Sequence, residues 1–188
     1  KFLSQGEMLI HGTTHAINAI ITGNTAKTAF LTTQGHPDIL VLREGGRIEP
    51  FNFRIPYPEP YIPRALTFEV PERMDGEGNV VLALDEAAVM DIIGALNAQK
   101  IEAVAVCFLW SIANPAHETR VGELLAQHMP EVPVSLSHIL NPALREYRRA
   151  SAVAIDASLK PLMERYLGSL TERLTAAGFQ GRTLVLTS

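Results

Sequence analysis

The residues best suited to chemistry lie in the stretch LIHGTTHAINAII, residues 9–21, where a strand-like run passes directly into a helix-like run. At such a turn the first backbone N–H groups of the helix are free and its dipole is positive, so the turn favours an anion. Gly12 lets a ligand approach the backbone closely. The hydroxyls of Thr13 and Thr14 can donate hydrogen bonds, and His11 can act as an acid, a base or a donor. The stretch is therefore a candidate site for a ligand oxygen that carries charge.

Two other interpretations of this stretch stay open from the residues alone. The threonines can serve only to cap the helix, with His11 as a hydrogen-bonded residue at the strand end. His11 and His15 are also four residues apart, the spacing at which two imidazoles on one helix share a metal ion. The metal interpretation is the weakest, because His11 precedes the expected cap and no acidic third ligand is near in the sequence. We therefore expect no metal site here.

A second candidate stretch is NPALREYRRASAVAIDASLKP, residues 141–161. Arg145, Arg148 and Arg149 crowd the first turns of the expected helix, where positive charge opposes the helix dipole. The stretch can be a solvated helix face with an ordinary Glu146–Arg149 pair. It can equally be the rim of a site, at which Glu146 and one arginine meet a polar ligand. The pattern favours neither interpretation over the other.

These stretches are positioned by a rhythm of strands and helices that is typical of parallel α/β architecture. Buried strands are expected at 8–10, 27–33 and 103–109, and a further strand at 132–137. Helices are expected after Thr13 or Thr14 up to Gly23, from Asp85 to about Gln99, after Asn114-Pro115, and after Asn141-Pro142 up to Gly178. Pro161 should kink or divide the last helix. Residues 66–84 predict a β-hairpin around the turn at 75–79.

The proline-rich segment interrupts this rhythm. Six of the twelve prolines lie between Pro50 and Pro71, which indicates extended, irregular chain. We therefore expect three parts: an α/β part at 1–43, a proline-rich insertion with the hairpin at 44–84, and an α/β continuation at 85–188.

Composition limits the function classes. Of the 188 residues 47% are hydrophobic, enough for a sizeable core. A net charge of −4 argues against a nucleic-acid or anionic membrane surface. No apolar run approaches the roughly 18–20 residues of a membrane span. The single cysteine, Cys107, excludes an internal disulfide and favours a cytoplasmic location. The chain opens on Lys1 and closes on a strand-like run, so we expect it to be an internal segment of a longer protein.

Several blocks of the sequence together resemble the hydantoinase A/5-oxoprolinase family, which includes N-methylhydantoinases and acetone carboxylase β subunits. HGTTHAINAII is similar to the family's His-Gly-Thr-Thr segment, and AKTAFLTTQGHPDIL to its Gly-Phe-Arg-Asp segment, with Pro37 in place of the usual Arg. VPERMDGEGNVV, AVAVCFLWSIANPAHE and REYRRASAVAIDASLKPLMERYL resemble the blocks that follow. The blocks occur in the family's order and cover nearly the whole chain.

The resemblance implies a fold similar to actin, sugar kinases and heat-shock ATPases, that is, a ribonuclease H-like α/β domain, here partial. It implies an ATP-dependent hydrolase of cyclic amides such as hydantoins or 5-oxoproline, in which a ring carbonyl is phosphorylated before water opens the ring. In the family one phosphate loop precedes the position of Lys1 and the other follows that of Ser188. We therefore expect ATP and Mg²⁺ to serve the full-length protein, and the isolated fragment to bind no cofactor and to be inactive.

Two groups of site residues follow from the resemblance together with the two candidate stretches. The expected catalytic residues are His11, Thr13, Thr14 and Glu146. The expected substrate-binding residues are Gly12, Asn18, Asp38 and Arg149. In this interpretation the residues from Gly12 to Thr14 face the activated substrate or the transferred phosphate, and His11 and Asn18 orient it.

Two alternatives remain. A subunit of the acetone-carboxylase type would phosphorylate a ketone or bicarbonate with the same cofactors. A non-catalytic docking module would use the aromatic side chains of the proline-rich segment as an interface; these are Phe51, Phe53, Tyr57 and Tyr61. The partners expected are a small cyclic amide and a second, hydantoinase B-like subunit or domain, without nucleic acid or membrane.

Overall fold

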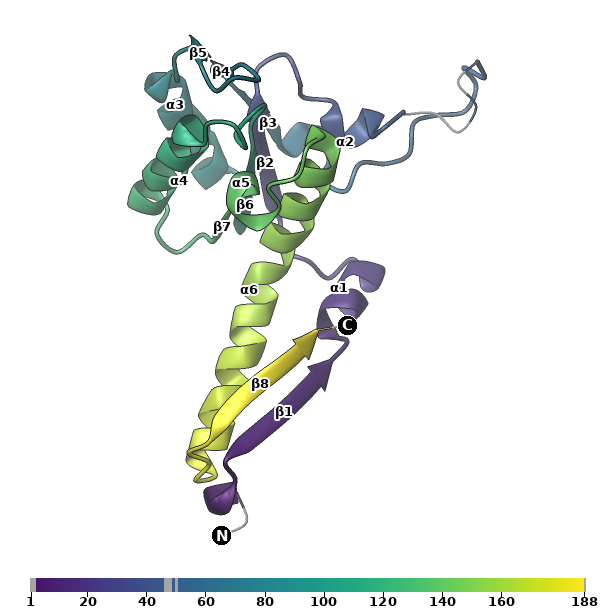
Figure 1. The fold of residues 1–188 in the computed structure, drawn as a ribbon. Coiled ribbons are helices and arrows are strands. Elements are labelled where there is room, and N and C mark those ends of the chain that lie inside the picture. The colour runs from purple at the N-terminus through teal and green to yellow at the C-terminus, as the bar shows by residue number, and fades with distance from the viewer. Residues whose placement is uncertain (1–2, 46–48, 50, 188) are drawn as a thin grey trace. The chain divides into compact units, whose positions relative to one another are not determined.

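The computed structural model describes residues 3–45, 49 and 51–187 of the chain (Figure 1). It divides into two compact units. Unit 1 combines the residues up to Ala26 with those from Leu159 onward, and unit 2 is Lys27–Ser158. Each unit builds its own mixed α/β structure around parallel strands, so the α/β class expected from the sequence is confirmed. No helix in the described ranges is both long and apolar enough to cross a membrane.

Unit 2 is built on a four-stranded parallel sheet in the order β3-β2-β6-β7. Its strands are β2 (Thr28–Thr33), β3 (Thr67–Val70), β6 (Ala103–Cys107) and β7 (Val134–Leu136). Every residue of β2 and β6 is buried, as expected for central parallel strands covered on both faces. The continuous apolar run of β6 therefore reflects two-sided burial.

Helices α3 (Glu86–Ala98) and α4 (Ala116–His128) cover one face of this sheet. Val104 and Val106 of β6 share a core with Val89 of α3 and Val121 of α4. The expected start of α3 at Asp85 is confirmed, whereas α4 begins one residue later than the Asn114-Pro115 signal predicted, with Pro115 at the cap position. The Asp85 carboxylate accepts from the backbone N–H of Ala88 at 3.0 Å, and the side-chain oxygen of Asn114 accepts from that of Ala116 at 3.0 Å.

The first half of α6 (Glu146–Ala176) lies against β6 and β7 in unit 2. Arg149 donates to the carbonyl of Phe108, and Ser135 donates to the Asp156 carboxylate. The helix begins later than the Asn141-Pro142 signal predicted, because α5 (Ser137–Leu140) comes first and Arg145 has a φ of 76°, which no right-handed helix accommodates. Pro161 does not divide α6, which continues through it. The boundary between the units falls nearby, after Ser158.

The predicted hairpin is present but shorter than expected. It pairs β4 (Arg73–Met74) with β5 (Val80–Leu82) in antiparallel fashion. The Asp75 carboxylate holds the turn by accepting from the N–H groups of Glu77 and Asn79, at 2.9 and 2.8 Å. The run before it, Thr67–Val70, pairs in parallel with β2, and its assignment to the hairpin was wrong. Two further short helices complete unit 2: α2 (Ile39–Leu42) and η2 (Arg64–Leu66).

Unit 1 pairs β1 (Met8–Thr13) with β8 (Arg182–Thr187) in parallel, beside α1 (His15–Thr22) and the second half of α6; η1 (Leu3–Gln5) precedes β1. Gly23 ends α1 with a φ of 68°, as the sequence predicted. The expectation of a buried first strand was wrong. Met8 and Ile10 are 53% and 60% exposed, because within the described residues β1 pairs only with β8.

Candidate functional site

The turn between β1 and α1 leaves its polar groups largely open. Thr14 stands at the cap position of α1, but its hydroxyl makes no capping hydrogen bond. The Thr13 hydroxyl instead accepts from the backbone N–H of His15 at 3.1 Å. Gly12 and Thr14 are exposed, and no atom lies within 4 Å of the place where a Cβ on Gly12 would stand. The turn therefore offers ligand-accessible backbone and one hydroxyl, that of Thr14, that does not cap the helix.

His11 is held by a tyrosine that the sequence did not point to. Its Nε2 lies 2.5 Å from the hydroxyl of Tyr166 on α6, and the His15 ring stacks on the same tyrosine with centroids 4.7 Å apart. Asn18 lies one turn into α1, where its amide donates to the Thr14 hydroxyl at 3.4 Å. Both imidazoles are thus occupied with Tyr166, and no group of three or more metal-ligand side chains occurs within the described ranges. Tyr166 is 155 residues from His11 in sequence, so spacing could not have found it.

The other three predicted site residues belong to unit 2. Asp38 is exposed and pairs with Arg64 at 3.0 Å, and it lines a surface pocket of about 240 Å³ with Gly35 to Pro37 and Arg43. Glu146 is the first residue of α6, and its backbone carbonyl lies 3.9 Å from the Cys107 sulfur. In the site-rim interpretation Glu146 and an arginine meet one ligand, but Glu146 is partly exposed whereas Arg149 is fully buried.

Arg149 is neither on a solvated face nor paired with Glu146. Its side chain is fully buried, donating to the carbonyl oxygens of Phe108 at 2.7 Å and Ala143 at 3.4 Å. Its Nε and the hydroxyl of Thr32 are the two buried side-chain polar atoms without a partner in the described part of the chain. The solvated-face interpretation of this arginine was wrong, because its helix packs this face against the end of β6.

Glu118 is the buried counterpart of Arg149. One carboxylate oxygen accepts from the Phe108 N–H and the Ser137 hydroxyl, each at 3.1 Å, and the other accepts from the N–H and Nδ1 of His138, each at 3.0 Å. Burial raises the pKa of this carboxyl, but these hydrogen bonds outweigh burial and hold the pKa below its ordinary value. Residue 108 is therefore bracketed by opposite charges, Glu118 on its N–H and Arg149 on its carbonyl.

A second buried carboxylate, Glu72, lies at the same end of the sheet. It accepts from the Thr33 hydroxyl and lies 2.9 Å from Nδ1 of His117, while the Leu109 N–H donates to the Thr33 oxygen at 3.0 Å. Close by, burial raises the pKa of the Cys107 thiol to about 12, so this cysteine is not a nucleophile. We name this series of hydrogen-bonded residues, Leu109–Thr33–Glu72–His117, the switch-point relay.

The relay lies where the winding of the sheet reverses. From β2 the chain passes to β3 on one side, and from β6 it passes to β7 on the other. In open α/β sheets, ligands bind outside the carboxyl ends of the strands at such a reversal. Sequence reasoning missed Glu72, His117 and Glu118, although the first lies in the Pro-Glu-Arg block and the others in the Asn-Pro-x-His-Glu block.

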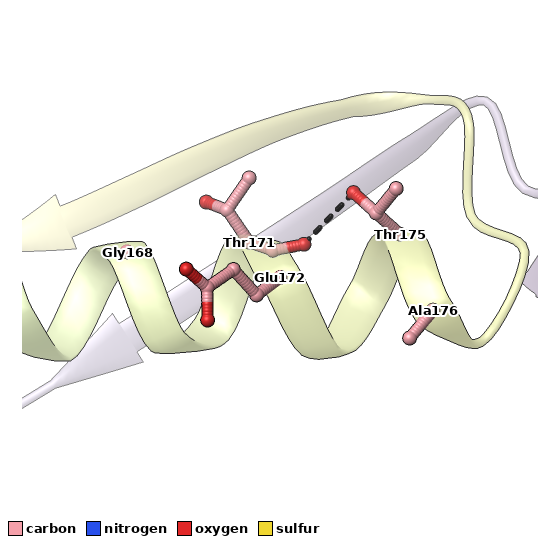
Figure 2. Close-up of a pocket in the computed structure, with 5 residues that line it drawn as sticks. All are labelled: Gly168, Thr171, Glu172, Thr175 and Ala176. Carbon is pink, nitrogen blue, oxygen red and sulfur yellow. Dashed lines mark hydrogen bonds between the residues drawn. The ribbon is translucent and has the colours of Figure 1, made fainter.

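The hollow along the last turns of α6 has no comparable polar convergence (Figure 2). It is lined from one helix, by Gly168, Thr171, Glu172, Thr175 and Ala176. Both threonine hydroxyls donate to carbonyls of their own helix, at 2.9 Å each. The hollow is helix surface, and we assign it no function.

The amino-acid sequence of this chain matches a family of known sequences. The chain matches the family described as the hydantoinase/oxoprolinase N-terminal region over residues 4–129. It therefore belongs to this family, as the resemblance predicted.

Individual proteins of known sequence or structure are also similar to this chain. The chain is 33% identical over 185 residues to caprolactamase subunit alpha of Pseudomonas jessenii, covering 97% of this chain and 27% of that protein. The crystal structure of the ATP-dependent caprolactamase from that organism superposes with a TM-score of 0.88 at 32% identity, over 98% of this chain and 27% of the other.

More distant functions occur among the relatives. The acetophenone carboxylase gamma subunit of Aromatoleum aromaticum is 32% identical over 199 residues, 99% of this chain and 27% of that protein. The 5-oxoprolinase of Saccharomyces cerevisiae is 31% identical over 200 residues, 93% of this chain and 16% of that protein. The chain thus spans 27% or less of the length of these relatives.

Proposed function

We propose that residues 1–188 are part of an ATP-dependent hydrolase of cyclic amides, in which a ring carbonyl is phosphorylated before water opens the ring. The observation that carries this proposal is the open β1–α1 turn in a chain whose relatives include a caprolactamase and a 5-oxoprolinase. Both names denote activity on a ring amide. A carbonyl oxygen that gains phosphate acquires negative charge, which preorganised donors stabilise.

Three groups at the turn would perform this work. The Thr14 hydroxyl and the free N–H groups at the start of α1 donate towards an oxygen lying over Gly12, which has no side chain to block the approach. His11 is fixed by Tyr166, so its ring is held in one orientation. Asn18, one turn further on, supports the Thr14 hydroxyl. The roles of Asp38, Glu146 and Arg149 in substrate binding or catalysis remain proposals for the same reaction.

ATP and Mg²⁺ are proposed as cofactors of the full-length protein, with ATP supplying the phosphoryl group. Mg²⁺ is usually held by one or two carboxylates together with substrate phosphates. The chain spans 27% or less of the length of its relatives, and we propose that other segments of the full-length protein hold the nucleotide and its metal. The further proposals are an actin- and sugar-kinase-like arrangement of the whole catalytic domain, with residues 44–84 as its insertion, and a cytoplasmic location.

The experiment uses the full-length protein. Release of phosphate from ATP is measured with ε-caprolactam, 5-oxoproline and hydantoin, and separately with acetone or acetophenone plus bicarbonate. The proposal expects stimulation by a cyclic amide and ring-opened product in proportion to phosphate. Stimulation only by a ketone with bicarbonate would establish the carboxylase alternative, which the 32% identity to an acetophenone carboxylase subunit supports.

Variants then test the turn itself. His11→Ala and the double variant Thr13→Ala/Thr14→Ala are expected to lower turnover by about 10²-fold, the typical effect of losing an oxyanion-stabilising donor. The matched control is Thr22→Ala, at the other end of the same helix. Unaltered ATP-coupled turnover in both turn variants would overturn this assignment. Calorimetry on residues 1–188 alone is expected to show no tight binding of Mg²⁺–ATP.

A partner subunit is proposed because two of the relatives are named as subunits. Phe51 and Phe53 of the proline-rich segment are 91% and 78% exposed. Exposed apolar side chains that lie together are typical of interaction sites. Deletion of residues 50–63 is expected to abolish association with a co-expressed hydantoinase B-like subunit and to spare nucleotide binding. If the segment is instead only an anchor of unit 2, the same deletion lowers the thermal midpoint and leaves association intact.

A further inference from the structure

The switch-point relay fixes the chemistry of one imidazole, that of His117. Glu72 is buried, and the Thr33 hydroxyl donates to one of its oxygens, so its other oxygen is left to accept from the histidine. With Nδ1 of His117 donating to Glu72, the neutral ring carries its lone pair on Nε2. Within the described chain this ring makes no other hydrogen bond, so Nε2 is available as an acceptor.

The relay also makes this acceptor rigid. The Thr33 oxygen accepts from the backbone of Leu109, so the end of β2 and the residues after β6 are tied to one carboxylate. His117 is the second residue of α4, and its neighbour Glu118 is anchored by hydrogen bonds to Phe108, Ser137 and His138. An imidazole oriented by a carboxylate that a third group orients is the arrangement by which proteins prepare a histidine for a ligand.

Exposure and position distinguish His117 from an ordinary buried pair. Its side chain is 12% exposed while that of Glu72 is 0% exposed, so the carboxylate is sealed and the imidazole reaches the surface. The relay lies at the reversal between β2 and β6, where open α/β sheets bind ligands.

We propose that the carboxyl end of the unit 2 sheet, between β2 and β6, is a binding site at which Nε2 of His117 accepts a hydrogen bond from a ligand N–H or O–H. The ligand class is a small cyclic amide that presents its ring N–H, and this part of the inference rests on the proposed function. The Nε2 of His11, by contrast, is engaged by Tyr166. Glu72 and Thr33 are positioning residues of this site.

Binding is tested in the full-length protein with histidine rings labelled with ¹⁵N. The His117 signals, assigned by their loss in His117→Gln, are expected to show the Nδ1–H tautomer and to shift on addition of ε-caprolactam, 5-oxoproline or hydantoin without ATP. The amide that shifts them is expected to bind about tenfold more weakly to His117→Gln, the order of effect of one lost hydrogen bond. His128→Gln, at the exposed end of the same helix, is the matched control.

A second variant separates positioning from folding. Glu72→Gln keeps the volume of the side chain, but its amide can donate to Nδ1 and favours the Nε2–H tautomer. In a variant that retains the thermal midpoint within a few degrees, the ¹⁵N spectrum is expected to show this switch together with the same weakened binding. Addition of free imidazole to His117→Ala is expected to restore part of the binding, which a merely structural role would not allow.

The outcomes are separable from those of the proposed function. Failure of every amide to stimulate ATP hydrolysis in the wild-type protein would overturn the proposed function. Failure of every amide to shift the His117 signals, or equal affinity of wild type and His117→Gln, would overturn this inference and leave the proposed hydrolase standing. A shift with an alcohol and none with any amide would overturn the assigned ligand class.

Discussion

The β1–α1 turn of unit 1 and the carboxyl end of the unit 2 sheet are both rich in polar side chains, yet they are built in opposite ways. At the turn, Gly12 and Thr14 are exposed and most donors are uncommitted. At the sheet end, Glu72, Glu118 and Arg149 are fully buried. Glu118 and Arg149 both bond the backbone of Phe108, and Glu72 is linked through Thr33 to the N–H of the next residue, Leu109. The β1–α1 turn should therefore tolerate substitution with little loss of stability, whereas the buried side chains at the sheet end support the fold itself.

The largest loss of folding stability is expected from substitution of Glu118. Glu118→Leu is expected to lower the free energy of unfolding by roughly 3–5 kcal/mol, because it strands a set of buried donors. Its effect on the thermal midpoint is expected to be about 10 °C, measured by calorimetry or circular dichroism. Glu123→Gln, exposed on the same helix, is expected to change stability by less than about 0.5 kcal/mol. A small effect of Glu118→Leu would contradict the structural role of the buried network.

The same carboxylate predicts a pH dependence. Its pKa is lower in the folded chain than in the unfolded chain, so its ionised form contributes stability above the unfolded value, ordinarily about 4.3. That contribution is lost as the pH falls through the folded pKa. Glu118→Gln should therefore flatten the acid limb of stability below about pH 4 relative to wild type, as measured by urea denaturation at several pH values. An unchanged acid limb would show that other carboxylates cause it.

Arg149 is expected to show the next largest effect. Arg149→Met removes the guanidinium that holds the carbonyl of Phe108 and leaves that carbonyl buried, at a cost of roughly 2–3 kcal/mol. Arg148→Met, on the exposed side of the same helix, is expected to cost less than about 1 kcal/mol, since it loses only a surface pair with Glu44. Equal costs in urea denaturation would contradict the distinction between the two arginines.

The smallest losses of folding stability are expected from substitution of Thr13 and Thr14. Thr13→Ala is expected to cost about 0.5–1 kcal/mol because its hydroxyl accepts from the His15 N–H. Thr14→Ala is expected to cost less than about 0.5 kcal/mol, since its hydroxyl makes no capping bond. In the full-length protein Thr14→Ala should nevertheless lower ATP-coupled turnover. A Thr14→Ala protein that loses stability without losing turnover would reverse the roles assigned to the two centres.

Local signals in the sequence were sufficient for most of the unit 2 fold. Asp85 caps α3 where predicted, and the two-sided burial of 103–107 follows from its unbroken apolar run. The start of α6 could not be predicted, because it depends on a left-handed residue, Arg145, that no propensity favours. The assignment of Thr67–Val70 to the hairpin failed since strand patterns do not specify the partner strand.

The two candidate sites also differ in how far they could be predicted from the sequence. His11 to Thr14 are adjacent in sequence, so their residue types alone indicated a site. The relay joins Thr33, Glu72 and His117 across 84 residues of chain, counted from 33 to 117, and only the folded sheet brings them together. Arg149 shows the converse error. It looked like part of a charged helix surface, but the orientation of the helix, which the pattern of charges did not indicate, buries it.

The division of the chain has a consequence for its synthesis. Unit 2 is one continuous segment, whereas unit 1 needs β1 from before it and β8 from after it. At about 5–20 residues per second, β1 leaves the ribosome roughly 10–35 seconds before the strand with which it pairs. During this interval unit 2 can complete its sheet, whereas β1, with Met8 and Ile10, has no β8 to pair with. We therefore expect β1 to gain its partner later than the strands of unit 2 gain theirs. Ribosome-bound chains halted before Arg182 should be cut by protease ahead of Lys27 and resist cutting beyond it.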